Sequence, residues 1–362
     1  MVEMEKYKLG DICEIVSGST PKTNIDEYWE GTIKWITPAE LNDDTYIITD
    51  SVRKITELAV KKTGLKSFPE GTVILSSRAP IGKVAIAGCE MYCNQGFKNL
   101  ICSKKINNKY LYWFLKGNTV FLNSLGRGAT FKELSKSIVS NIEINLPDIV
   151  YQKKAVETLE KVSEIIALRK RELSSLDDLI KARFVEMFGN PATPGDKFKT
   201  CKLGEVADVK SSHRVFTTEF VAEGVPFYRG TEIGVLASGQ QPEDSYRISM
   251  EHYRKIASDD SKPMRGDLLL PSICNKGQVW MVDTDEPFYY KDGRVLCISP
   301  ERSVFDSRYL QFYMKLRTEA EYPKLGSGST FAEFKIFQLK ELEVDIPPMN
   351  SQKSFDLFAD QV

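Results

Sequence analysis

Hydrophobic residues occur in short runs over most of the chain, and Gly, Pro or Asn bound these runs. The runs are rich in β-branched and aromatic residues, which is typical of strands. They read EIVSG, IKWIT, TVILSS, KVAIAG, KNLICS and IEINL in the first half, and VPFYRG, DLLLPS, VWMVD, VLCIS and LEVDI in the second. One helix-like stretch accompanies each set, at residues 108–125 and 307–322. Strands mixed with few helices predict an α+β fold for each half.

Residues 148–188 follow a different pattern, because this stretch contains no Gly or Pro. Its apolar residues recur at alternating steps of four and three, except where Arg169 and Arg183 take two of the positions. The apolar positions are Ala155, Leu159, Val162, Ile166, Leu173, Leu176, Ile180 and Met187. A seven-residue repeat over four heptads predicts a coiled-coil helix. We expect it to start after Pro147-Asp148, to end at 189–191 and to be on the order of 60 Å long.

An apolar seam of this length is unfavourable in water unless another helix covers it. The two seam arginines have two interpretations: solvent-exposed side chains at a loose seam, or a polar docking point for a partner protein. After Pro347-Pro348, residues 348–362 read as the start of a second such helix that stops early. We therefore expect its missing length either to be supplied by another chain or to have been lost by truncation.

The chain also repeats itself. KYKLGDICEIVSGST (6–20) corresponds to KTCKLGEVADVKSSH (199–213), with Leu9 aligned on Leu203 at an offset of 194. LGRGATFKEL (125–134) returns as LGSGSTFAEF (325–334), and LPDIVYQKK (146–154) returns as IPPMNSQKS (346–354), both at an offset of 200. Solenoid repeats are much shorter, at roughly 20–50 residues, so this pattern indicates a duplicated domain.

These observations predict an α+β fold made of two similar mixed α/β domains separated by a long coiled-coil helix, in a pseudo-two-fold repeat with a shortened second helix. We place the first domain at 1–147 and the long helix at 148–190. The second domain is placed at 191–347, and the start of the second helix at 348–362.

Composition narrows the function classes. The chain has 362 residues, with 49 Lys and Arg against 50 Asp and Glu, so its net charge of −1 lacks the basic surplus common in nucleic-acid binders. Local clustering of basic residues can still provide a binding face. The odd count of seven cysteines and the charged N-terminus predict reduced thiols and a cytoplasmic location. No apolar run is long enough for a membrane span.

Known catalytic patterns are not recognisable. Asn190-Pro191-Ala192-Thr193 lacks the second proline and the aromatic residue of an adenine methyltransferase motif, and Gly82-Lys83 lacks the rest of a P-loop. Cys89 and Cys93 form at most half of a zinc site, since the chain has just two histidines. We therefore expect no catalytic residue, no metal and no cofactor bound by this chain.

Several motifs carry a family resemblance, and they recur in the same order in both halves. In the first half they are YKLGDICEIVSGSTP (7–21), WITPAEL (35–41), GTVILSSRAPIGKVAI (71–86), NQGF (94–97), RGATFKELS (127–135) and LPDIVYQKK (146–154). Their counterparts are CKLGEVADV (201–209), RGDLLLPSICNKGQVWMV (265–282), GSGSTFAEF (326–334) and IPPMNSQK (346–353). With these motifs the chain resembles the specificity subunit of type I restriction–modification systems.

The resemblance implies a definite role. Each domain would be a target recognition domain that reads one half of a bipartite, asymmetric site in double-stranded DNA. The helices would set the spacing and dock two modification subunits, which methylate adenine with S-adenosylmethionine, and a restriction subunit that uses ATP and Mg²⁺. The specificity subunit itself would be non-catalytic. A second specificity chain could complete the coiled coil.

Base reading needs Arg, Lys, Asn, Gln or similar donors, and phosphate holding needs Lys, Ser, Thr and free backbone amides. Loops that offer these groups occur at matching places in both halves, although each could be a simple turn. The candidates in the first half are Ser19, Thr20, Lys22, Thr23, Asn24, Arg78, Lys83, Asn94, Gln95, Lys98, Arg127 and Thr130. Those in the second half are Ser211, Ser212, His213, Arg214, Asn275, Lys276, Lys291, Arg294, Ser327, Ser329 and Thr330.

Two other functions remain open at this stage. A lone nuclease or methyltransferase with an unrecognised site would modify DNA without partners. A protein-binding scaffold, in which the coiled coil serves to dimerise, would have no affinity for any duplex.

Overall fold

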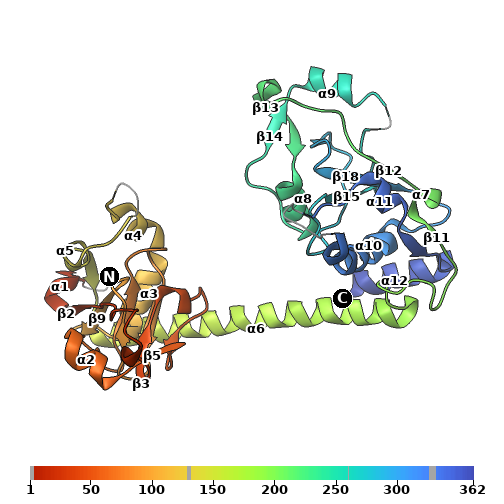
Figure 1. Ribbon diagram of the computed structural model, residues 1–362. Coiled ribbons are helices and arrows are strands. Elements are labelled where there is room, and N and C mark those ends of the chain that lie inside the picture. Colours follow the sequence, from red (N-terminus) through yellow and green to blue (C-terminus); the bar gives the residue numbers. More distant parts are fainter. Residues whose placement is uncertain (1–3, 129–131, 260, 326–331) are drawn as a thin grey trace. The chain divides into compact units, whose positions relative to one another are not determined.

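The computed structural model describes residues 4–128, 132–259, 261–325 and 332–362. The chain forms two compact units, residues 1–170 and 171–362. Each unit is a mixed α/β structure, and the long helix α6 (Ile149–Phe188) contributes residues to both (Figure 1). The predicted fold class is therefore confirmed.

A five-stranded sheet with the order β2-β9-β6-β7-β4 forms the centre of the first unit. A smaller sheet has the order β5-β3-β8, and β1 pairs with β10. The strands are β1 (Glu5–Lys8), β2 (Cys13–Ser17), β3 (Trp29–Ile36), β4 (Ile47–Ile48), β5 (Arg53–Ile55), β6 (Val73–Ser76), β7 (Val84–Ala87), β8 (Tyr92–Cys93), β9 (Phe97–Cys102) and β10 (Glu143–Leu146). The helices are α1 (Leu9–Ile12), α2 (Glu57–Thr63), α3 (Asn108–Gly117), α4 (Thr119–Leu125) and α5 (Lys136–Ser140), with 3₁₀ turns η1 (Asp26–Tyr28) and η2 (Pro38–Glu40).

The core of the first unit lies between the large sheet and α3. Strands β6 and β7 are buried at every position, which explains their continuous apolar sequence. Helix α3 contributes Leu111, Tyr112 and Leu115 to this core. The loops at the strand ends therefore extend from strands that are packed in the core.

The single helix predicted at 108–125 is wrong, because α3 and α4 are separate helices that meet at Asn118. Asn118 has a φ of −112° and a ψ of 25°, and its side-chain amide donates to the carbonyl of Phe114 at 2.8 Å. Such side-chain bonds to the backbone compete with the helical pattern, so an Asn inside an apolar stretch can end a helix.

The second unit repeats this arrangement. Its main sheet has the order β12-β18-β15-β16, a smaller sheet has the order β14-β13-β17, and β11 pairs with β19. The strands are β11 (Thr200–Lys202), β12 (Ala207–Lys210), β13 (Phe220–Tyr228), β14 (Tyr246–Ile248), β15 (Leu268–Pro271), β16 (Trp280–Met281), β17 (Tyr289–Tyr290), β18 (Val295–Pro300) and β19 (Glu343–Asp345). The helices are α7 (Leu203–Val206), α8 (Gly230–Ala237), α9 (Met250–Ile256), α10 (Ser307–Glu321), α11 (Ile336–Lys340) and α12 (Met349–Gln361), with 3₁₀ turns η3 (Thr217–Glu219) and η4 (Tyr322–Leu325).

The two units share even an irregularity of strand pairing. In β3 the register shifts so that Trp29 and Ile33 both lie opposite Ile55, and in β13 Phe220 and Val225 both lie opposite Ile248. A glycine lies inside each bulge, Gly31 or Gly224, where a Cβ would come within 2.3 Å of the carbonyl oxygen of the facing isoleucine. The internal repeat of the sequence therefore extends to backbone detail that no short motif displays.

Helix α6 begins and ends close to the predicted residues. The Asp148 carboxylate accepts from the amides of Val150 at 2.8 Å and Tyr151 at 3.0 Å, which is the geometry of an N-cap. Gly189 follows the last turn with a φ of +88°, a conformation that favours glycine after a helix.

The apolar seam of α6 is only partly buried. Leu159, Val162, Ile166 and Leu173 are exposed, whereas Ile180 and Met187 pack against the core of the second unit. Arg183 lies 2.8 Å from Glu186 and above the Phe358 ring, so this seam arginine is paired within the second unit. The residues that α6 buries most deeply there, Phe184 and Phe188, lie outside the predicted seam.

A buried glutamine fixes the start of the helix that ends each repeat. Gln152 donates to the carbonyls of Pro147 at 2.9 Å and Lys105 at 3.0 Å, and it accepts from the amide of Asn107 at 2.8 Å. Gln352 does the same in the second unit with Pro347, Val304 and Asp306. Because Asn107 and Asp306 are the N-caps of α3 and α10, this one side chain ties two helix starts together.

Candidate nucleic-acid interface

Loops at one end of the large sheet carry the candidate residues of the first unit. Ser17 at the end of β2 lies opposite Lys98, and Ser76 at the end of β6 lies opposite Phe97 at the start of β9. The segments that leave these strands therefore start side by side, although they are far apart in the sequence.

Hydrogen bonds join these segments to each other. The amide of Ser19 donates to the carbonyl of Cys93 at 3.0 Å, and the Thr20 hydroxyl donates to the side-chain oxygen of Gln95. The amide of Ser77 donates to the carbonyl of Gly96 at 2.7 Å, and Ser77 in turn accepts from the amide of Leu134 at 2.9 Å. Arg127 and Glu133 exchange backbone hydrogen bonds at 3.1 and 2.9 Å, so the four loops that carry Ser19, Arg78, Gln95 and Arg127 are joined to one another.

Most candidates in the first unit are accessible to a ligand. Ser19, Thr20, Lys22, Thr23, Asn24, Gln95 and Arg127 are exposed, and Arg78 and Asn94 are half-buried. Within the described residues, the Arg127 guanidinium makes no ion pair with a carboxylate. These side chains have the donors and acceptors that base edges and phosphates require.

Two lysines among the candidates are engaged inside the unit. The Lys83 ammonium donates to the carbonyls of Pro38 at 3.1 Å and Leu41 at 2.5 Å, so it holds the η2 turn. Lys98 is 6% exposed, and its ammonium lies 3.3 Å from both the Ser77 hydroxyl and the Glu133 carboxylate. The structure thus gives both lysines an internal role.

The second unit gathers its candidates at the matching end of its main sheet. The Ser212 hydroxyl donates to the carbonyl of Tyr290 at 2.6 Å, and the Ser211 hydroxyl accepts from the amide of Gly293 at 2.8 Å. The amide of Ser272 donates to the carbonyl of Arg294 at 2.9 Å and its carbonyl accepts from Phe334 at 2.7 Å, as Ser77 does with Gly96 and Leu134.

Acidic partners surround the cationic candidates of the second unit. Arg214 lies 3.5 Å and Lys291 lies 3.8 Å from the Asp292 carboxylate, while Arg294 lies 2.8 Å from Glu333. His213 contacts Asp259 at 2.6 Å. Asn275 and Lys276 are exposed on the loop after β15.

Two carboxyl groups of this surface remain ionised at neutral pH. Hydrogen bonds from Ser261 and then from His213 hold the pKa of Asp259 below its usual range. The neighbouring Lys335 is the main cause of a lowered pKa at Glu333. Thr130, Ser327, Ser329 and Thr330 lie outside the described residues.

Each unit has a concavity beside these loops. In the first unit a cavity of about 1040 Å³ is lined by Ser17, Lys98, Arg127 and Glu133, among others. In the second unit a cavity of about 490 Å³ is lined by Arg229, Ser272, Ile273, Lys291 and Arg294, among others. Four of the sequence-predicted residues, Lys98 and Arg127 in the first unit and Lys291 and Arg294 in the second, therefore line hollows of the surface.

Comparison with known proteins places the first half of the chain in a family. Residues 1–177 match the family model described as a type I restriction modification DNA specificity domain. The specificity subunit of the type I restriction enzyme MjaIX from Methanocaldococcus jannaschii is 40% identical over 195 residues, which is 53% of this chain. The MjaVIII specificity subunit of the same organism is 23% identical over 380 residues, covering 97% of this chain and 84% of that protein. Residues 1–177 therefore belong to the family of type I specificity domains, and the chain as a whole is similar to type I specificity subunits.

The match to the MjaIX subunit covers 44% of that protein, so this chain spans less than half of its length. A solved structure titled "Structural basis underlying complex assembly and conformational transition of the type I R-M system" has a TM-score of 0.55 and 19% identity. The alignment covers 99% of this chain and 90% of that chain. At this identity, the likeness shows a shared fold.

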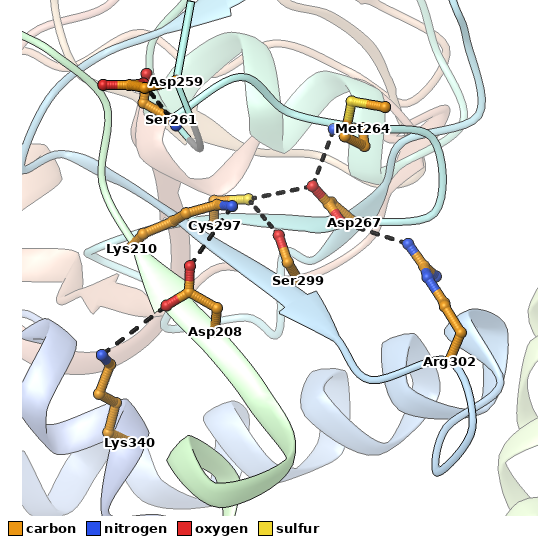
Figure 2. A network of polar contacts seen from close by, with 10 residues as sticks. All are labelled: Asp208, Lys210, Asp259, Ser261, Met264, Asp267, Cys297, Ser299, Arg302 and Lys340. Carbon is orange, nitrogen blue, oxygen red and sulfur yellow. Dashed lines mark hydrogen bonds and ion pairs between the residues drawn. The ribbon is translucent and has the colours of Figure 1, made fainter.

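A second polar cluster in this chain is structural. Figure 2 shows Asp267, which is 2% exposed, accepting from the amide of Met264 at 2.9 Å and facing Arg302 at 3.3 Å. Burial raises the pKa of the adjacent Cys297 thiol to about 12, so it stays protonated. Satisfied buried groups of this kind hold a turn in place and leave no donor for a ligand.

Two carboxylates on these surfaces were not predicted from the sequence. Glu133 and Glu333 each bind cations from neighbouring loops, although neither was a candidate. A signal was available, since FKEL and FAEF carry Glu at the same place in the repeat.

Among the described residues, no cluster of three or more His, Cys, Asp or Glu side chains could hold a metal ion. None of the described helices has the length and apolar content to span a bilayer.

Proposed function

We propose that this specificity subunit recognises a bipartite, asymmetric site in double-stranded DNA, with one half-site read by each unit. The single observation that supports this most is the convergence of four loops in the first unit and of their counterparts in the second. The frameworks of the two loop sets share hydrogen bonds, whereas the side chains at their tips differ. Two readers of different half-sites require this combination of a common framework and different tips.

The same proposal covers partners and chemistry. The chain docks two modification subunits and a restriction subunit, and a second specificity chain can cover the exposed seam of α6. The partner subunits bind S-adenosylmethionine, ATP and Mg²⁺, and this chain itself is non-catalytic. The exposed apolar residues of α6, such as Val162 and Ile166, support docking because large apolar patches mark interaction surfaces.

A domain exchange tests the two-reader function. The full chain is produced with its modification subunits, and the methylated motif is read by sequencing genomic DNA of the host. Replacing residues 1–147 with those of a specificity subunit of different target should change one half of the motif and leave the other intact. A change in both halves would contradict the assignment of one reader to each unit.

Two controls separate the remaining alternatives. Methylation by the purified chain without partners would indicate an enzyme. A complex that assembles but binds no member of a split-site duplex library would indicate a protein scaffold.

A further inference from the structure

Glu133 and Glu333 occupy equivalent places in the two units. Each precedes a residue, Leu134 or Phe334, whose amide donates to the carbonyl of the serine after β6 or β15, at 2.9 Å and 2.7 Å respectively. Both carboxylates therefore lie beside the loop that follows the central strand, at the candidate interface.

Each of these carboxylates binds one arginine and one lysine. In the first unit Glu133 lies 3.3 Å from Lys98 and 3.8 Å from Arg78. In the second unit Glu333 lies 2.8 Å from Arg294 and is also paired with Lys335. One negative charge against two positive charges leaves each site with one net positive charge.

The cations come from different positions of the repeat. Ser77 and Ser272 are equivalent, so the residues that follow them, Arg78 and Ile273, correspond to each other. The Ser77 amide donates to the carbonyl of Gly96 and the Ser272 amide donates to the carbonyl of Arg294, so Arg294 corresponds to Gly96. The strand register likewise matches Lys98 to Leu296, since Phe97 faces Ser76 as Val295 faces Pro271. The two units thus have the same arrangement of charges around the glutamate, although the arginine and the lysine come from different positions of the repeat.

Stability does not account for this agreement. The Arg294 side chain is 62% exposed and the Arg78 side chain 35% exposed, and ion pairs at exposed positions contribute little to folding. A shared ligand accounts for it better. A guanidinium has five N–H donors in a fixed fork, and a carboxylate on one side orients the fork while leaving donors free.

The carboxylate also discriminates between the two parts of DNA that an arginine can contact. For a phosphate at the same guanidinium, the carboxylate of Glu133 or Glu333 weakens the attraction of the site's net positive charge, whereas a base edge is uncharged and avoids this repulsion. The commonest specific contact of arginine in the major groove is the paired hydrogen bond to O6 and N7 of guanine.

We infer that Arg78 and Arg294 each read one guanine, in the half-sites of the first and the second unit respectively. Glu133 and Glu333 are positioning residues that orient the two guanidinium groups, and Lys98 and Lys335 offset the charge of the carboxylates. This inference rests on the proposed function, because it assigns a base to each reader.

The test uses the full chain in complex with its modification subunits, with the methylated motif and duplex affinities as readouts. Arg78→Lys keeps the charge but loses the paired geometry. We expect it to lose about 5- to 150-fold of the discrimination for guanine at one position of the first half-site, with the second half-site unchanged. Arg294→Ala should relax one guanine of the second half-site alone.

A rescue variant tests the equivalence of the loops. Ile273 is exposed and lines the same cavity as Arg294, so Ile273→Arg in the Arg294→Ala background returns a guanidinium to Glu333 from the loop used in the first unit. We expect this double variant to regain preference for guanine at the lost position. Arg265→Ala is the matched control, because Arg265 is 63% exposed and lies 3.1 Å from Asp285. It should leave the motif unchanged.

Each other outcome overturns the inference. A wild-type half-site without guanine, or an unchanged motif in both arginine variants, removes the assignment while leaving the proposed function in place. An equal loss of affinity for all sequences, with a salt dependence reduced by about one phosphate contact, assigns the arginines to the backbone instead. Absence of any recognised motif in the wild-type complex would instead reject the proposed function. Thermal unfolding of the arginine variants should stay close to the wild type, since both ion pairs are partly open to solvent and such pairs contribute little to stability.

Discussion

Gln152 and Gln352 illustrate how one residue can organise a joint between helices. Each side chain is fully buried, yet all of its polar groups face backbone atoms of two segments. Buried amides are stable when they are satisfied in this way, and they are costly when one partner is removed. The glutamine therefore belongs to the architecture of the repeat and not to its ligand surface.

Gln152→Leu should destabilise the first unit by about 2–4 kcal/mol, because the Asn107 amide and two carbonyls lose their partner in a dry environment. Urea unfolding of the full chain measures the change. Gln352→Leu should have a similar effect on the second unit, and Gln241→Leu, at an exposed position, should stay within about 0.5 kcal/mol of the wild type. A Gln152 variant as stable as this control would show that the joint is held by other contacts.

Residue types could be predicted from the sequence more readily than residue roles. The glutamine was visible in both LPDIVYQ (146–152) and IPPMNSQ (346–352), but the contacts of Gln152 with residues 105 and 107 depend on the folded chain. Lys83 and Lys98 were reasonable DNA contacts by type, and the structure turns both inward. Conversely, Glu133 was not predicted as a site residue, because a carboxylate fits a proposed DNA surface only when neighbouring cations pair with it, and the sequence does not show those pairs.

At the scale of elements, α6 is anchored to the first unit by a polar contact as well as by its buried start. Glu160 accepts from the Tyr46 hydroxyl at 2.6 Å and from the Lys109 ammonium at 2.8 Å. The contact with Lys109, followed by that with Tyr46, lowers the pKa of Glu160. Burial raises the pKa of Tyr46, so its hydroxyl stays protonated and continues to donate.

The lowered pKa of Glu160 predicts a pH dependence of stability. Its contribution should be complete above the ordinary glutamate pKa of about 4.3 and should be lost as the pH falls through the lower pKa of the folded state. Glu160→Gln should remove on the order of 1 kcal/mol at pH 7 and little at low pH. Unfolding measured between pH 7 and pH 3 checks this, with the exposed Glu164→Gln as control. Equal losses at both ends of the range would contradict an ionic contribution.

Elements were predicted well where one pattern dominates over several residues. The buried strands β6, β7 and β9 and the long helix α6 correspond closely to their apolar patterns. The short helices α2, α8 and α9 were not predicted, because seven or eight residues contain too little periodicity to distinguish a helix from a loop. The seam of α6 left out Phe184 and Phe188, because these residues pack on the second unit and follow its surface rather than a heptad.

At the scale of the whole molecule, the chain consists of two similar units and a helix to which both contribute. Helix α6 lies in the first unit up to Lys170 and in the second from Arg171. Contacts with the bodies of the units occur near its two ends, through Gln152 and Glu160 at one end and Phe184 and Phe188 at the other. The middle of the helix can therefore be altered without touching these contacts.

Together with the proposed function, this arrangement gives a prediction about the spacing between the two DNA half-sites. Deleting one heptad, residues 162–168, shortens the helix by roughly 10 Å and keeps the seven-residue phase of the seam. Since the deletion leaves all candidate loops intact, the complex should recognise the same two half-sites at a different separation, as read from the methylated motif. Replacing the same heptad with another of equal length and pattern should leave the spacing unchanged. A deletion that altered the bases of either half-site would mean that the helix takes part in reading DNA, and a deletion that altered neither bases nor spacing would mean that it does not set the distance between the readers.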